Sequence, residues 1–340
     1  MFLLDVAVPD AQAEDLHDGL TDLAAVSLTT VDVEGERFSV HRRLQDMTRR
    51  SLDATQSRQR ITEVLGWVTA AFDGDPSDVR SWARLDPLTP HGLSVTQWAD
   101  MVGIVEPTAR LMSDLGVLLY AKSLHAQAEP LYRRACAIDE ASLGPDHPHV
   151  AIRLNNLAAL LQATNRLEEA EPLLRRALAI DEARFGPDHP TVAIRLNNVA
   201  SLLQATNRLA EAEPLMRRAL VIGEASFGPD HPTVAIYLNS LARLLQHTNR
   251  LTEAEPLMHR ALAISEASFG PDHPTVATRL SNLAALLQAT NRLAEAEPLM
   301  RRALVIGEAS FGPDHPTVAI YLNISPHCWQ PLTGWSRRNP

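Results

Sequence analysis

Residues 144–185 read GPDHPHVAIRLNNLAALLQATNRLEEAEPLLRRALAIDEARF, and close copies of this stretch follow at a constant step of 42 residues. Between successive copies of GPDHP lie two apolar segments, such as Val150 to Thr164 and Leu167 to Ala183, in which apolar side chains recur at the helical period. Self-similarity at this period predicts a row of helical hairpins. The pentapeptide begins at Gly144, Gly186, Gly228, Gly270 and Gly312.

The pentapeptide contains the residues that end one helix and begin the next. Gly144 can adopt the left-handed conformation that ends a helix, and Pro145 prevents the helix from continuing. Asp146 or His147 can cap the following helix, with Pro148 in its first turn. The sequence therefore predicts a helix stop and a helix start within five residues.

A single hairpin cannot bury its apolar stripe, so neighbouring hairpins are expected to stack. The large and small apolar residues match the tetratricopeptide signature, and the unit with LNNLA, EAEPL, RRAL and GPDHP resembles the repeats of kinesin light chains. This resemblance covers residues 106–323 and implies a mostly α fold, a right-handed α-solenoid of five hairpins with the opening of a sixth. The signature positions are Leu154, Leu157, Ala158, Leu161, Ala170, Leu174 and Ala177.

The N-terminal part of the chain has a different character. Residues 27–33 and 37–40 are predicted strands, with helices expected at 20–24 and 40–52. Residues 20–52 resemble the winged-helix module that ends bacterial signalling NTPases of the NB-ARC (STAND) type, so residues 1–55 are expected to be a small winged-helix-like α+β segment. Residues 56–105 are expected to be a helical connector.

Two features suggest that the gene is a fragment. The sequence has no Gly-x-x-x-x-Gly-Lys-Ser/Thr loop, so the nucleotide site of those NTPases is missing or lies in a separate upstream reading frame. At the other end, residues 324–340 break the periodicity, which favours a truncation or frameshift over the alternative, an apolar cap formed by Trp329 and Trp335. Residues 204–239 and 288–323 are identical, which indicates duplication of a two-repeat block.

Composition narrows the classes of partner and compartment. The formal net charge of -10 provides no basic surface for nucleic acid or for an anionic membrane. No apolar run approaches ~18 residues, and Cys136 and Cys328 imply no disulfide framework, so a cytoplasmic location is expected. Neither a cofactor nor a metal is expected.

The sequence offers no constellation of catalytic groups. The GPDHP histidines recur once per repeat, and a rise of ~10 Å between packed helix layers would keep them too far apart to share a metal. Glu168, Glu169 and Glu171 suit the positive end of a helix dipole, and no G-x-S-x-G, H-E-x-x-H or C-x-x-C motif occurs. The chain is therefore predicted not to be an enzyme.

A ladder of amides on the first helix of each unit suggests binding instead. Amides both donate and accept hydrogen bonds, so they can hold the backbone of an extended peptide. The resemblance implies that the asparagines of this ladder face the concave surface; the alternative is that they pair with the backbone of the adjacent repeat. The predicted peptide-binding residues are Asn155, Gln162, Asn197, Gln204, Asn239, Gln246, Ser281 and Gln288, flanked by Arg153, Arg195 and Arg279.

The flanking arginines are expected to favour acidic side chains of the ligand through bidentate pairing, or else to be solvated helix surface. Tyr237 takes the arginine position in the third repeat, and Arg243 lies nearby in the sequence. The leading hypothesis is a scaffold that binds a peptide or partner protein on the concave face. The alternative is a regulatory fragment of an NB-ARC-type NTPase, whose partner would be a separately encoded nucleotide-binding protein.

Overall fold

The computed structural model describes residues 29–32, 37–40, 52–313 and 315–323, which fall into two compact units that divide between Leu115 and Gly116. Residues 77–80 are grouped with the second unit. The boundary lies inside α6 (Glu106–Ala121), and so within the first predicted repeat.

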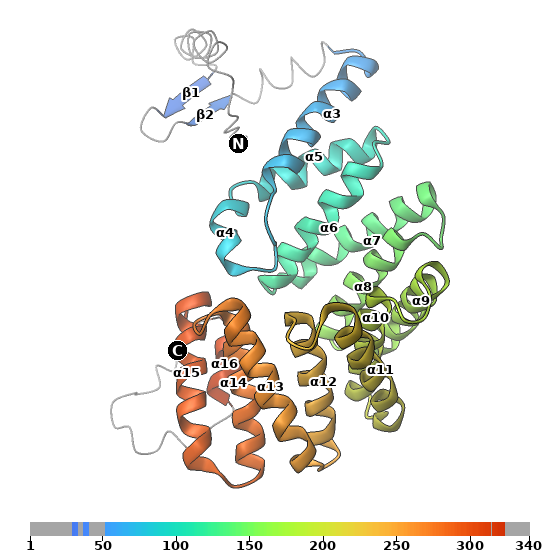
Figure 1. The fold of residues 1–340 in the computed structure, drawn as a ribbon. Helices are drawn as coiled ribbons and strands as arrows, with labels where there is room; N and C mark the ends of the chain where they lie inside the picture. The colour runs from blue at the N-terminus through green and yellow to red at the C-terminus, as the bar shows by residue number, and fades with distance from the viewer. Residues whose placement is uncertain (1–28, 33–36, 41–51, 314, 324–340) are drawn as a thin grey trace. The chain divides into compact units, whose positions relative to one another are not determined.

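The first unit contains a β-hairpin and several helices of unequal length (Figure 1). Strands β1 (Thr29–Asp32) and β2 (Arg37–Val40) are antiparallel, as predicted, with Thr29 opposite Val40. The helices expected at 20–24 and 40–52 lie outside the described residues, and a two-stranded hairpin alone does not support the winged-helix assignment. Helix α3 (Ala54–Ala71) packs against α5 (Thr89–Met101), and α4 (Val79–Leu85) lies between them in sequence.

The second unit is an all-helical array in which antiparallel pairs follow one another along a curved path (Figure 1). The helices occur where the period predicts them. They are α7 (His125–Leu143), α8 (Pro148–Ala163), α9 (Leu167–Phe185), α10 (Pro190–Ala205), α11 (Leu209–Phe227), α12 (Pro232–His247), α13 (Leu251–Phe269), α14 (Pro274–Ala289), α15 (Leu293–Phe311) and α16 (Pro316–Asn323).

The GPDHP turn caps each first helix through its histidine. The His147 Nδ1 accepts a hydrogen bond from the backbone N–H of His149 at 3.2 Å, and Pro148 occupies the first turn of α8. Gly144 ends α7 with φ of 91° and ψ of 157°, so its φ is positive as expected, but its ψ is extended rather than left-handed helical. That region is open almost only to glycine.

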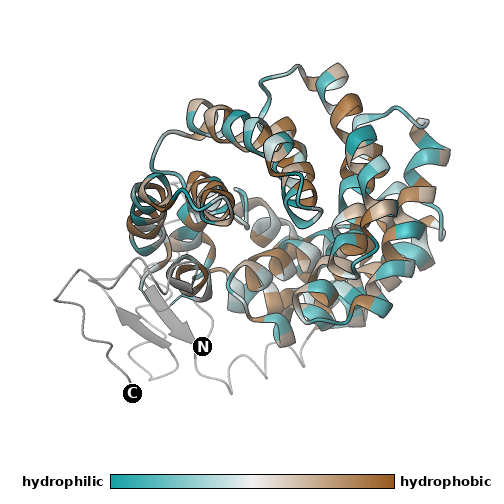
Figure 2. Ribbon diagram, turned by 90° about the horizontal axis from the view of Figure 1, so that it is seen from below, coloured by the Kyte–Doolittle hydropathy of each residue, from teal (hydrophilic) through white to brown (hydrophobic). Residues whose placement is uncertain are grey.

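Alanines and branched residues fill the interior between the helices. Ala158, Ala170 and Ala177 are completely buried, and Leu154 and Leu161 beside them are almost completely buried. Small residues at these positions allow close packing of the helices. Helices of the array carry both hydrophobic and hydrophilic residues, as amphipathic helices do (Figure 2).

Ion pairs between arginine and glutamate connect the second helices of successive repeats. Arg208, the residue just before α11, contacts Glu171 of α9 at 2.8 Å and Glu211 in the first turn of α11 at 2.8 Å. Arg250 repeats the arrangement with Glu213 and Glu253. The first helices α10, α12 and α14 also contact one another from repeat to repeat.

Candidate functional site

Two of the predicted amides on α8 line a cavity. A cavity of about 220 Å³ lies between α8 and α10, and the end of α6 borders it. Its walls include two of the predicted binding residues, Asn155 and Gln162. The full lining is Tyr120, Asn155, Ala159, Gln162, Ala163, Leu174, Asn198 and Ser201.

Two of the ladder asparagines are paired with the next repeat. The Asn198 Nδ2 donates to the Asn155 Oδ1 at 2.6 Å, and the Asn282 Nδ2 donates to the Asn239 Oδ1 at 2.9 Å. The partner is therefore the amide side chain of the adjacent first helix, not the backbone that the sequence alternative assumed. These bonds occupy the acceptor atoms of Asn155 and Asn239 at the α8–α10 and α12–α14 junctions.

The intervening junction, between α10 and α12, lacks this bond. Ser240 stands at the position that asparagine takes in Asn198 and Asn282, and no hydrogen bond reaches the Asn197 Oδ1. Asn197 is only 6% exposed. Two turns further along α10, the Nε2 of Gln204 is also buried and has no hydrogen-bond partner. One acceptor and one donor on a single helix are thus left unsatisfied.

The remaining amide-ladder positions differ among themselves. Gln162 and Gln246 are half-buried, and Ser281 is buried. The Gln288 Nε2 lies 3.2 Å from the Sδ of Met300, a weak acceptor. The structure therefore separates residues that the repeat pattern made equivalent.

Two of the three predicted arginines are held in buried ion pairs. The Arg153 Nε donates to the Asp139 Oδ2 at 2.9 Å, and the Arg195 Nε donates to the Asp181 Oδ2 at 2.8 Å. Each aspartate comes from the second helix of the preceding repeat, fourteen residues earlier. Because these guanidinium groups already have carboxylate partners, the geometry favours a structural role for both.

The same slot holds a different pair of residues in the next repeat. Gly223 replaces the aspartate and Tyr237 replaces the arginine, and a Cβ added at Gly223 would lie 2.6 Å from the tyrosine ring. Gly307 and Tyr321 repeat this exchange. Burial raises the pKa of Tyr237 to about 12, so the phenol stays neutral.

Arg279 keeps the arginine but has lost the aspartate. Ser265 occupies the aspartate position, and its hydroxyl donates to the Ala261 carbonyl oxygen of its own helix at 2.8 Å. Arg279 is 8% exposed, and its Nε has no partner. Burial, and then repulsion from Arg243, lowers the pKa of Arg279 to about 10, so the side chain is still a cation at neutral pH.

The groups that the sequence raised as chemical candidates take structural roles. Among the described residues, no cluster of His, Cys, Asp and Glu is arranged to hold a metal. Burial raises the pKa of the Cys136 thiol to about 11, which keeps it protonated and unreactive. Glu169 and Glu171 are ion-paired with arginines.

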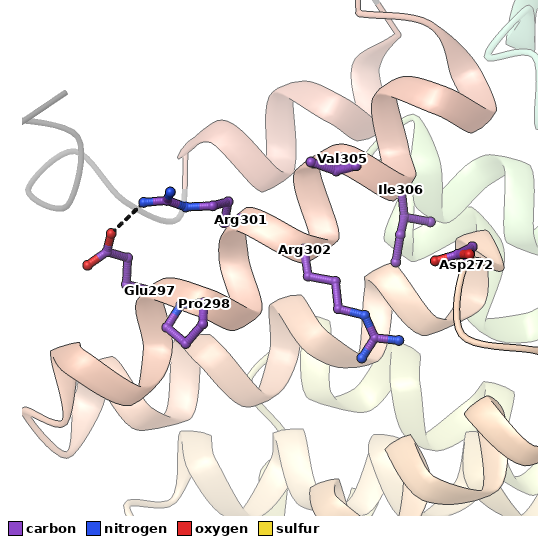
Figure 3. Close-up of a pocket in the computed structure, with 7 residues that line it drawn as sticks. All are labelled: Asp272, Glu297, Pro298, Arg301, Arg302, Val305 and Ile306. Carbon is purple, nitrogen blue, oxygen red and sulfur yellow. Dashed lines mark hydrogen bonds and ion pairs between the residues drawn. The ribbon is translucent and has the colours of Figure 1, made fainter. Parts of the chain in front are cut away.

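Other cavities lie away from the amide ladder. One of about 550 Å³ is formed by α15 and Asp272, and the ion pair between Glu297 and Arg301 lies at its edge (Figure 3). An apolar cavity of about 370 Å³ in the first unit lies between α3 and α5. Both arginines that line the α15 cavity already have carboxylate partners, since Arg301 contacts Glu297 and Arg302 contacts Glu266.

Comparisons with known proteins agree with the fold. The sequence model of the tetratricopeptide repeat family matches residues 107–183, 154–222, 191–256 and 233–306, which together span more than half of the chain. A search of curated proteins gives no match. No helix in the described parts of the chain is long and apolar enough to cross a membrane.

Two solved structures align with the chain. BtubC (BKLC) from P. vanneervenii aligns with a TM-score of 0.50 and 23% identity, over 70% of this chain and 92% of that one. A Podosopora anserina protein of nearly identical TPR-like repeats, assigned as a kinesin light chain, aligns with a TM-score of 0.46 and 24% identity, over 60% of this chain and 97% of that one. Identities this low bear on the fold alone.

Proposed function

Because the chain belongs to the tetratricopeptide repeat family, we propose that it is a non-enzymatic scaffold that binds an extended segment of a partner protein along its first helices. The segment would lie on the concave face, across α8, α10, α12 and α14. Repeats of this family in general bind protein partners, and the cavity between α8 and α10 carries three amide side chains among the residues that line it.

The unsatisfied pair on α10 carries this proposal. A buried polar atom without a partner costs about 1–3 kcal/mol. The unpaired acceptor of Asn197 and the unpaired donor of Gln204 are therefore energetically unfavourable in the unbound protein. A peptide backbone carries both kinds of group that these atoms lack, an N–H for Asn197 and a carbonyl for Gln204. Seven helical residues span ~10 Å, the length of about three residues of extended peptide.

Ser240 is the residue that keeps this position open. Replacing it with asparagine reproduces the junctions at Asn198 and Asn282, where the neighbouring amide occupies the acceptor. We expect Ser240→Asn to fill the Asn197 Oδ1 from within the protein and so to compete with a ligand. The substitution adds an amide without adding charge.

Selection of short random peptides, displayed on phage, for binding to the intact protein tests the proposal. Peptides selected on the wild type should bind Asn197→Ala and Ser240→Asn at least tenfold more weakly, measured by calorimetry. Ser226→Asn, the same change on the exposed surface of α11, should leave binding unchanged. Selection of no binder, or equal affinity for Ser240→Asn and wild type, would contradict the peptide-binding surface.

The β-hairpin favours a second candidate function. Strands β1 and β2 occur where the NB-ARC resemblance places them, which supports a C-terminal sensor or regulatory fragment of a signalling NTPase. This candidate requires a partner with a nucleotide-binding loop. The candidate is supported if a reading frame immediately upstream encodes such a loop and its product binds the full chain. An upstream region without such a reading frame would count against the candidate.

A further inference from the structure

A buried slot recurs at each junction between a second helix and the following first helix. It is formed by two residues fourteen positions apart, and its content differs between repeats. Two slots hold an aspartate–arginine ion pair, Asp139 with Arg153 and Asp181 with Arg195. Two others hold glycine and tyrosine, in which the ring takes the space above the glycine.

The slot between α13 and α14 contains neither the aspartate–arginine pair nor the glycine–tyrosine pair. It keeps the cation, Arg279, but has Ser265 in place of the aspartate, and the serine hydroxyl is turned to the backbone of its own helix. The atom left without a partner is the Arg279 Nε, the same atom that contacts a carboxylate in Arg153 and Arg195. The slot therefore lacks one carboxylate.

An uncompensated cation at this depth is energetically unfavourable. Burying a charge is costly unless it is paired and hydrogen-bonded, and Arg279 is only 8% exposed. Among the five slots that the structure describes, this is the one that keeps an arginine without a carboxylate. The remaining nearby charge, Arg243, is itself a cation and increases the local positive potential.

We propose that the slot formed by Ser265 and Arg279 receives the side-chain carboxylate of an aspartate or glutamate from the bound partner segment, an inference that rests on the proposed function. The planar guanidinium matches a carboxylate in a two-bond arrangement. Ser265 is shorter than the aspartates at 139 and 181 and supplies no carboxylate of its own to Arg279.

The slot is next to the surface assigned to the partner segment. Arg243 occupies on α12 the position that Ala159 and Ser201 occupy on α8 and α10, and both of those residues line the amide cavity. Arg243 is exposed, so it offers a second cation to an acid approaching from that side. The segment would thus meet Asn197 on α10, Arg243 on α12 and Arg279 on α14.

Titration of the full chain with the N-acetylated amide of aspartate tests the slot independently of any peptide. The readout is the NMR signal of the Arg279 Nε–H, assigned by its absence in Arg279→Gln. We expect a saturable shift at millimolar concentrations, no shift with the asparagine analogue, and a weaker response to inorganic phosphate, because the larger and more highly charged phosphate costs more to bury at this depth. A response to phosphate equal to that of the aspartate compound would overturn the carboxylate assignment.

Ser265→Asp provides the internal competitor. It restores the residue found at 139 and 181, so we expect a higher melting temperature and at least a tenfold loss of affinity for the aspartate compound. Ser268→Asp adds the same charge to an exposed position of α13 and should retain the affinity. Undiminished affinity in Ser265→Asp, or no shift in the wild type, would overturn the proposal.

Asp181→Ser gives the reciprocal test, in which α9 and α10 acquire the composition of the open slot. It should leave the Arg195 Nε without its carboxylate and add a second set of shifts at that residue. Failure of Arg195 to respond would contradict the idea that a missing carboxylate creates the site. Because these titrations use no peptide, their outcome is separate from that of the display experiment.

Discussion

At the residue scale, positions that the repeat pattern makes equivalent have different environments. The sequence predicts Arg153, Arg195 and Arg279 as one set of ligand contacts, but only Arg279 lacks an acid. The distinction depends on the residue fourteen places earlier, which is Asp139, Asp181 or Ser265. Comparison of the repeats at that spacing would have found it, whereas the helical period within one repeat does not.

The glycine–tyrosine slot gives a prediction at this scale. Gly223→Ala places a methyl group 2.6 Å from the Tyr237 ring, so the ring or helix must shift. We expect a loss of about 1–3 kcal/mol of unfolding free energy, measured by urea denaturation. Gly66→Ala, in a helix where nothing lies within 4 Å of the new Cβ, should instead stabilise by about 0.5–1 kcal/mol. Equal effects of the two changes would contradict the packing described.

At the element scale, the period predicts where the helices begin and end, but not the partners of their charged residues. The sequence assigns Glu169 and Glu171 to the helix dipole. In the structure Glu171 contacts Arg175 of the same helix and Arg208 of the next repeat. The 37-residue separation of Glu171 and Arg208 becomes a contact only once the hairpins stack, so a single-helix reading of the sequence misses it.

The ion pairs predict that acid destabilises the array. Hydrogen bonds from Arg217, and then from Arg250, hold the pKa of Glu213 below its ordinary value of 4.5. Since this pKa is lower in the folded state, its stabilising contribution is present above about pH 4.5 and is lost as the pH falls through the folded-state value. Thermal melts followed by circular dichroism should show a falling midpoint over this range.

Glu213→Gln isolates this contribution. The variant should melt below the wild type near neutral pH, and the difference between the two should shrink as the pH falls below 4.5. The same change at Glu168, which is exposed, serves as the control. A constant difference at all pH values would show that the ion pairs do not link the repeats.

At the scale of the whole molecule, the identical segments 204–239 and 288–323 make the array extensible. A copy of residues 204–287 inserted after Leu287 recreates junctions that are already present in the chain. Because the stability of stacked repeats is approximately a sum of repeat and neighbour terms, the longer protein should unfold at a higher urea concentration. A lower midpoint would indicate that the added repeats and their junctions do not stabilise the array.

The open slot between α13 and α14 gives such lengthening a further consequence. Each inserted block contains another copy of Ser265 and Arg279, so the number of acid-accepting positions would grow with the number of blocks. A ligand with two suitably spaced acidic residues would then engage both at once, and its avidity would exceed the affinity of either contact alone. Recombination between the duplicated gene segments would therefore change how firmly a multivalent acidic partner is held without altering a single contact residue.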